Sequence, residues 1–342
     1  MADFSPVKNV LRPSLAVAAC LLPLIGCAGE SPPEEGEAPT SVPGAESSPA
    51  PVDTVIVEFG SEQDIEAFFD EIGYGPDHWA AGVREIPRLY VTAVGDRWRQ
   101  RANDDLTVQS KKRIFFRAMG PLALRSNELI RAERDRLLGL PATEALSDEE
   151  RRWLAELAED YGLEVPDVDM DAGDGADGEP WGALRTELQN RVDEVPVSLV
   201  LAQAANESGW GTSRFATEGN ALFGQWTFGG SGMLPAEQRA SLGDYRVAAF
   251  ESPLLSVVAY MRNLNTHRSY ARLRELRAEA RAADETPRGL DLAGGLDRYS
   301  ERGQEYVDEI RSMIEFNQLQ DTDLTYLAPG PVYLVIPADG TG

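Results

Sequence analysis

The stretch VPVSLVLAQAANESGWGTSRFATEGNALFGQW, residues 195–226, decides how this chain folds. Its first part has the spacing of an amphipathic helix, in which apolar residues return to one buried face. The residues on that face are Val197, Val200, Leu201 and Ala204. Asp193 and Glu194 precede the helix and suit its positive N-terminal end. Gly209 predicts the end of the helix, because glycine readily adopts the left-handed conformation of a C-cap.

Glu207 continues the apolar stripe, at a position where another apolar residue would be expected. A carboxyl group at the rim of a buried face loses hydration, which disfavours its charged form and raises its pKa. A raised pKa suits a general acid, and Trp210 would provide an aromatic wall nearby. The alternative is a structural role, in which Glu207 is buried and paired with an arginine such as Arg214. The spacing alone leaves both hypotheses open.

Length, charge and histidine content limit the possible functions. A chain of 342 residues has room for about two domains, and its net charge of -25 repels polyanions, which excludes a nucleic-acid partner. The only histidines, His78 and His267, lie far apart without metal-ligand spacing, which disfavours a zinc amidase. Because the sequence contains no glycine-rich phosphate loop, a nucleotide-dependent activity has no support, and we expect no cofactor.

The first residues have the features of a secretory signal. Lys8 and Arg12 are followed by the apolar run LAVAACLLPLIG, which is too short to span a bilayer as a helix. The run leads into LIGC, which resembles a bacterial lipobox and implies cleavage before Cys27 and acylation of its thiol. A plain secretory signal with a chance cysteine is the alternative. Residues 1–26 are therefore expected to be a lipoprotein signal peptide. Because the next residue, Ala28, is not the aspartate associated with inner-membrane retention, the resemblance points to the outer membrane, with the protein facing the periplasm.

Composition divides the following part of the chain. Residues 27–52 are rich in Pro, Glu, Ser and Gly and are expected to form a disordered tether. After the β-branched run TVIVEF, residues 53–161 have mainly helical patterns and are expected to form a helical N-terminal region. Pro121 lies inside the longest of these patterns and should kink or split that helix.

Residues 162–180 are expected to be an acidic linker. The start of a calcium-binding loop is matched by Asp167, Asp169 and Asp171. Ala172 then stands where the sharp turn requires glycine, and Gly178 stands where a bidentate glutamate is needed. The sequence therefore favours a solvated linker over a calcium site, and no metal is predicted.

Residues 205–226, ANESGWGTSRFATEGNALFGQW, resemble the signature of the bacterial glucosaminidases of glycoside hydrolase family 73. That signature is a helix ending in E-S-G-W/Y-G-x-S, followed by G-N-x-L-F-G. Residues 250–277 and 295–317 extend the match and make the chain similar to the Bax-type proteins of Gram-negative bacteria. The resemblance is strong over about residues 181–319 and weaker over residues 61–140. It does not cover the tether, the acidic linker or the segment after Asp321.

The resemblance implies a mainly α (α+β) fold: a lysozyme-like helical lobe and a small β-hairpin lobe, with the sugar cleft between them. Residues 181–320 would form this glucosaminidase domain, preceded by the helical N-terminal region, and residues 321–342 would be a C-terminal tail. The glycine-rich stretch after Phe223 suits the β lobe, whereas Ser252 and Pro253 read as the start of another helix.

The resemblance also implies roles for individual residues. Glu207 corresponds to the general acid that protonates the leaving glycosidic oxygen. An acidic residue on the β lobe, thirty-odd residues later, would activate water, and Asp244 or Glu237 can fill that place unless both are surface acids. Tyr299 matches the tyrosine of the last family motif and would position the acetamido group or steady the transition state, or else is a core aromatic. Three aromatic residues suit stacking on sugar rings or packing between lobes: Trp210, Phe223 and Trp226.

The function implied is a peptidoglycan hydrolase that cleaves β-1,4 bonds of N-acetylglucosaminyl glycan strands. Its partners would be those strands and, through acylated Cys27, a lipid membrane. A lytic transglycosylase is one alternative, although that family continues to a G-L-M-Q type motif where residues 221–225 read ALFGQ. A cell-wall-binding lipoprotein without catalytic activity is the other, which the intact motifs at Glu207 and Tyr299 disfavour.

Overall fold

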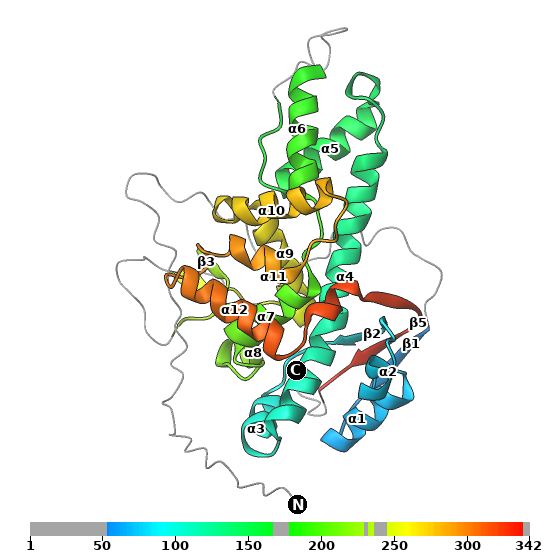
Figure 1. Cartoon of the computed structure of the whole chain (residues 1–342), viewed down its shortest axis with the longest axis vertical. Helices are drawn as coiled ribbons and strands as arrows, with labels where there is room; N and C mark the ends of the chain where they lie inside the picture. Colours follow the sequence, from blue (N-terminus) through cyan, green and yellow to red (C-terminus); the bar gives the residue numbers. More distant parts are fainter. Residues whose placement is uncertain (1–52, 167–177, 229–231, 236–244, 338–342) are drawn as a thin grey trace, which may run out of the picture.

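The computed structural model describes residues 53–166, 178–228, 232–235 and 245–337. Its fold is mainly α with two small sheets, which confirms the predicted fold class (Figure 1). No helix among these residues is long and apolar enough to cross a membrane. Several residues singled out in the sequence lie outside the described residues: Cys27, Asp167, Asp169, Asp171, Glu237 and Asp244.

The N-terminal region contains strands as well as the predicted helices. Its elements are β1 (Thr54–Val57), α1 (Glu62–Glu71), α2 (Pro76–Ala80), β2 (Glu85–Val91), α3 (Asp96–Asp104), α4 (Val108–Gly139), the 3₁₀ turn η1 (Thr143–Ala145) and α5 (Asp148–Asp160). Three side-chain caps fix where helices begin, with Ser61, Thr107 and Ser147 accepting from backbone N–H groups in the first turns of α1, α4 and α5.

The second half is a helical bundle with a short hairpin. Its elements are α6 (Gly178–Arg191), α7 (Val197–Ser208), α8 (Arg214–Gly219), β3 (Trp226–Phe228), β4 (Tyr245–Val247), α9 (Pro253–Thr266), η3 (Arg268–Tyr270), α10 (Ala271–Ala282), α11 (Gly289–Leu292), η4 (Ala293–Gly295), α12 (Gln304–Phe316), η5 (Gln320–Leu324) and β5 (Tyr326–Val335). The antiparallel β3–β4 pair lies where the sequence predicts the small β lobe.

The segment expected to be a C-terminal tail contains the central strand of a sheet. β5 lies between β1 and β2, and it runs parallel to both. Arg88 of β2 fastens this sheet to the helices, because its guanidinium donates to the Ala328 carbonyl and forms a bidentate ion pair with Glu128 of α4 at 2.9 and 2.7 Å. The two ends of the described chain are therefore parts of one unit.

The longest helix, α4, runs along the molecule between this sheet and the helices α7 and α9 (Figure 1). It continues through Pro121, so the predicted split is wrong. Proline lacks an N–H and removes one helical hydrogen bond. The next two residues, Leu122 and Ala123, are completely buried. The packing of this helix on both sides outweighs the local penalty of proline.

The first turn of α7 is capped by a residue far away in the sequence. Pro196 is the N-cap and has no side chain that can accept a hydrogen bond. Asp323 of η5 takes this role, because its carboxylate accepts from the Ser198 N–H at 2.8 Å and from the Ser198 hydroxyl at 2.9 Å. The same carboxylate accepts from the Gly289 N–H at 3.0 Å. One partly buried aspartate thus joins α7, α11 and η5.

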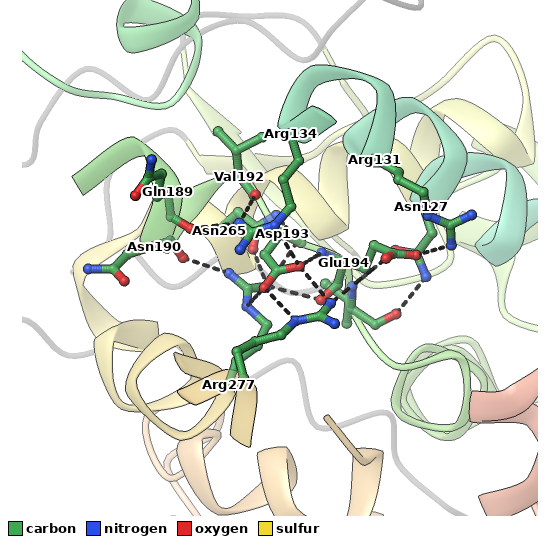
Figure 2. Close-up of polar contacts among 12 residues, drawn as sticks. Asn127, Arg131, Arg134, Gln189, Asn190, Val192, Asp193, Glu194, Asn265 and Arg277 are labelled. Atoms are coloured by element: carbon green, nitrogen blue, oxygen red, sulfur yellow. Dashed lines mark hydrogen bonds and ion pairs between the residues drawn. The ribbon is translucent and has the colours of Figure 1, made fainter. Parts of the chain in front are cut away.

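Asp193, just before α7, pairs with arginine side chains, whereas the sequence suggested an interaction with the positive end of the helix (Figure 2). Its side chain is 4% exposed, and its carboxylate pairs with Arg281 at 2.9 Å and with Arg277 and Arg134 at 3.7 Å. Burial works to raise the Asp193 pKa, but the arginines outweigh it and hold the pKa below its usual value. Glu194 is likewise paired, with Arg131. The network fixes the segment that leads into α7.

Candidate active site

Glu207 lies in the last turn of α7. The helix ends at Gly209, whose left-handed conformation (φ 57°, ψ 46°) confirms the predicted C-cap. Trp210 and Gly211 also have positive φ angles, 63° and 76°, so the chain turns sharply away after the helix. This turn is held in place because the Trp98 indole N–H donates to the Trp210 carbonyl at 2.9 Å. A Cβ on Gly211 would lie 3.0 Å from the same indole, and this close contact together with the positive φ favours glycine there.

The Glu207 side chain is half-buried and has a phenol as its hydrogen-bond partner. The Tyr306 hydroxyl, from the first turn of α12, donates to Glu207 Oε1 at 2.7 Å. Arg214 is engaged elsewhere, with Glu218 at 3.1 Å and with the Leu234 carbonyl at 2.6 Å. The hypothesis of a Glu207–Arg214 ion pair is therefore wrong, and within the described part of the chain Glu207 forms no ion pair.

The surroundings of Glu207 favour its neutral form. Burial raises the Glu207 pKa above its ordinary value. The Tyr306 hydrogen bond and the positive charge of Arg302 act in the opposite direction without cancelling it. Arg302 is itself paired with Glu309 at 2.5 Å, which weakens its influence. A carboxyl group with this balance holds its proton at a higher pH than an ordinary glutamate, as a general acid requires.

A chain of hydrogen bonds sets the direction in which Tyr306 donates. The Tyr260 hydroxyl donates to Gln203 Oε1, and the Gln203 amide donates to the Tyr306 hydroxyl at 2.9 Å. Tyr306 therefore accepts from Gln203 and has its own proton for Glu207 Oε1. The proton that Glu207 carries in its acid form consequently belongs on the other oxygen, Oε2.

Tyr299 lies beside this chain of hydrogen bonds without joining it. Its ring stacks on Tyr306, with centroids 5.2 Å apart and planes 9° from parallel, and its hydroxyl donates to the Phe223 carbonyl at 3.4 Å. Burial and the nearby Glu207 charge raise the Tyr299 pKa well above its usual value. The phenol is neutral and supports Tyr306, which is the tyrosine that contacts Glu207.

The three aromatic residues predicted to stack on sugars are in different situations. Phe223 is 3% exposed and stacks on Tyr260 at 3.8 Å, so its ring is part of the core and offers no face to a glycan. Trp210 is half-buried against Phe115 and Phe116 of α4.

Trp226 opens β3 and lies half-buried against Tyr245 of β4, with ring centroids 4.6 Å apart. Its position on the hairpin remains compatible with a contact to substrate. The two candidates for the second acid, Asp244 and Glu237, come between β3 and β4 in the sequence and lie outside the described residues. Their prediction is unchanged by the structure.

The sequence reading missed two residues of the site, Tyr306 and Gln203. Gln203 precedes Glu207 by four residues, which places both on one helix face. Tyr306 follows Tyr299 by seven residues and lies on the buried face of α12 with Val307, Ile310 and Ile314. Helical spacing thus indicates that both side chains point inward. Their contact with one another, 103 residues apart, has no sequence signal.

Comparison with known proteins agrees with this geometry. The glucosaminidase family model, described as mannosyl-glycoprotein endo-beta-N-acetylglucosaminidase, matches residues 183–319. Protein bax of Escherichia coli (strain K12) is 32% identical over 211 residues, which cover 61% of this chain and 70% of bax. This chain belongs to the Bax-type family of glucosaminidase-domain proteins. No solved structure matches the chain.

The glucosaminidase domain contains every residue of the hydrogen-bonded chain that ends at Glu207. A domain of this kind indicates a glycosidase-type enzyme that acts on a glycan. The family match does not include the N-terminal sheet or α4, although α4 packs directly on α7 of the glucosaminidase domain. Within the described ranges, no cluster of three or more histidine, cysteine, aspartate or glutamate residues could hold a metal ion.

Proposed function

We propose that this protein is a peptidoglycan hydrolase that cleaves β-1,4 bonds of N-acetylglucosaminyl glycan strands, with Glu207 as the general acid. The observation that carries the proposal is the state of Glu207. Its pKa is raised, it has no cationic partner among the described residues, and it lies in the helix-end motif of the glucosaminidase domain. A structural glutamate would be paired, whereas a general acid needs a proton to give away.

In the proposed reaction, Glu207 Oε2 gives its proton to the glycosidic oxygen as the bond to the sugar breaks. The carboxylate left behind keeps its hydrogen bond from Tyr306 to Oε1, and this bond is strongest when Glu207 is charged. Tyr306 therefore stabilises the charge that develops during bond cleavage more than the neutral starting state, which is the condition for catalysis. A water molecule then completes the hydrolysis.

The group that activates this water is proposed to be Asp244 or Glu237, which follow Trp226 in the sequence. Trp226 is proposed to contact the sugar chain and Tyr299 to steady the site through its stacking on Tyr306. The substitutions Asp244→Asn and Glu237→Gln rank the two acids. If neither lowers the rate by even about tenfold, the assignment to these two acids is wrong, and the catalytic partner lies elsewhere or is the acetamido group of the substrate.

Digestion of purified peptidoglycan tests the reaction type. Mass spectrometry of the soluble products is expected to show new reducing ends at N-acetylglucosamine. Products ending only in anhydro-sugars would identify a lytic transglycosylase instead. Release of peptides alone would exclude glycan cleavage, and binding to peptidoglycan without any product would identify the non-catalytic lipoprotein.

We also propose that acylated Cys27 anchors the protein at the outer membrane, facing the periplasm. The support is the basic and apolar sequence before Cys27 and the LIGC motif itself. An anchor at this position would hold the hydrolase next to the cell wall, which is its proposed substrate.

A further inference from the structure

A pocket lies between the N-terminal region and the glucosaminidase domain, and it uses none of the residues bonded to Glu207. Its volume is about 210 Å³. Side chains from α2 and the turn before it form one wall, α4 forms another, and the turn between α12 and η5 closes it. Leu201 of α7 lies at its base. The pocket therefore depends on both halves of the chain.

Arg117 of α4 brings a positive charge to this pocket, and no carboxylate of the described residues forms an ion pair with it. Its Nε donates to the Tyr74 carbonyl at 2.6 Å, which fixes the plane of the guanidinium. Its two terminal nitrogens have no hydrogen-bond partner, and it forms no ion pair, among the residues that the structure describes. Burial lowers the Arg117 pKa, and the opposing charges of Asp70 and Glu66 do not cancel this effect. Arg113, one turn earlier, also lines the pocket, but it is paired with Glu66.

The other walls offer apolar surface and unused polar atoms. Tyr74, Trp79 and Phe116 line the pocket with aromatic rings. His78 also lines it, and its buried Nδ1 has no hydrogen-bond partner. At another point of the lining, the Glu85 carboxylate accepts a hydrogen bond from the Tyr326 hydroxyl at 3.3 Å. The pocket thus combines one unpaired cation, one carboxylate and apolar surface.

This combination defines the ligand. A guanidinium with a fixed plane and two free terminal nitrogens matches a carboxylate in a bidentate arrangement. The Glu85 carboxylate in the same lining repels polyanions such as nucleotides but accepts N–H groups. The volume is below the 300–1,000 Å³ of typical drug-sized sites, so one or two amino-acid residues are the appropriate size.

We propose that this pocket is a second binding site, which takes a short peptide by its free carboxylate on Arg117. The ligand's side chain would lie against Tyr74 and Phe116, and its N–H groups would face Glu85. Resting on the proposed function, we assign the peptide to the stem of peptidoglycan, which carries D-amino acids. The N-terminal region and α4 would then bind the peptide part of the wall, while the Glu207 site acts on the glycan part.

Titration monitored by ligand-observed NMR tests this proposal on the full chain. The probes are D-alanyl-D-alanine, its C-terminal amide and L-alanyl-L-alanine. The free dipeptide is expected to bind at least about tenfold more tightly than the amide, because a hydrogen-bonded charge pair is lost on amidation. This comparison needs no variant. Equal binding of acid and amide, or no binding of any probe, would overturn the proposal.

Variants then locate the site. Arg117→Gln is expected to weaken D-alanyl-D-alanine binding about tenfold or more. Arg125→Gln is the matched control, because Arg125 lies on the same helix outside the pocket lining and is paired with Glu128, and it is expected to leave binding unchanged. Loss of binding in both variants would contradict the placement. Equal affinity for the L,L dipeptide would overturn the assignment to the peptidoglycan stem.

The Glu207→Gln variant separates this proposal from the proposed hydrolase activity. It is expected to bind D-alanyl-D-alanine as the wild type does, because no pocket residue contacts Glu207. If the wild-type protein binds the dipeptide but cleaves no glycan, the second binding site is supported and the proposed hydrolase activity is wrong. If the wild-type protein cleaves glycan but does not bind the dipeptide, the hydrolase activity is supported and the second binding site is wrong.

Discussion

Replacing Glu207 by glutamine separates a catalytic role from a structural one. The amide has the shape of the acid, and its carbonyl oxygen can still accept from Tyr306, so the hydrogen bonds through Gln203 and Tyr260 are retained. What is lost is the proton that Glu207 would give to the glycosidic oxygen. General acid catalysis is worth about 10²–10⁴-fold, so kcat is expected to fall by that factor, an increase of about 2.7–5.5 kcal/mol in the activation free energy.

The structure predicts little change in stability for the same variant. Removing one partner of a buried ion pair costs about 3–5 kcal/mol, because the other charge is stranded. Glu207 has no such partner among the described residues, since Arg214 pairs with Glu218 and Arg302 pairs with Glu309. The free energy of unfolding should therefore change by less than about 1 kcal/mol, and the melting temperature by less than about 4 °C.

The assay measures release of soluble fragments from peptidoglycan, together with thermal unfolding of the same protein preparations. Glu218→Gln is the matched control, because it makes the same chemical change at a surface ion pair, and it is expected to leave the rate unchanged. The catalytic reasoning is refuted if Glu207→Gln keeps more than about a tenth of the wild-type rate. It is refuted equally if a large melting shift accompanies a proportionate loss of activity.

Four other changes test separate parts of the structure. Tyr306→Phe removes a hydrogen bond that favours charged Glu207, so the Glu207 pKa should rise further and the alkaline limb of kcat against pH should move to higher pH; an unmoved limb would contradict the contact. Asp193→Asn strands buried Arg277 and should lower the free energy of unfolding in urea by about 3–5 kcal/mol. The Asp193 pKa is held below its ordinary value of 3.8, so the contribution of Asp193 to wild-type stability is complete above that pH. This contribution is lost as the pH falls through the folded pKa. The stability difference between the two proteins should therefore shrink in acid. Metabolic labelling with a fatty acid should tag the wild type but not Cys27→Ser, and label on the variant would remove the lipoprotein proposal. A chelator should leave the activity unchanged; a loss that Ca²⁺ restores would assign a calcium site to the segment of Asp167, Asp169 and Asp171.

The sequence predicted the features that depend on neighbours along the chain. Helical spacing located α7, the left-handed preference of glycine located its end at Gly209, and the glycine-rich stretch located the hairpin. Glu207 was found because a carboxylate interrupts an apolar stripe. These signals lie within a few residues of one another, so the pattern of residue types is enough to read them.

The tertiary structure decided the features that join distant segments. It set β5 between β1 and β2, capped α7 with Asp323 from 125 residues away, and carried α4 through Pro121 by packing on both sides. In the site, the family motif singled out Tyr299, whereas Tyr306 was missed. Only the crossing of α12 over α7 decided that Tyr306, 99 residues from Glu207, is the one that donates to it. Residue types fix which side chains are buried, whereas the partner of a buried polar group depends on how whole elements pack, which no local pattern records.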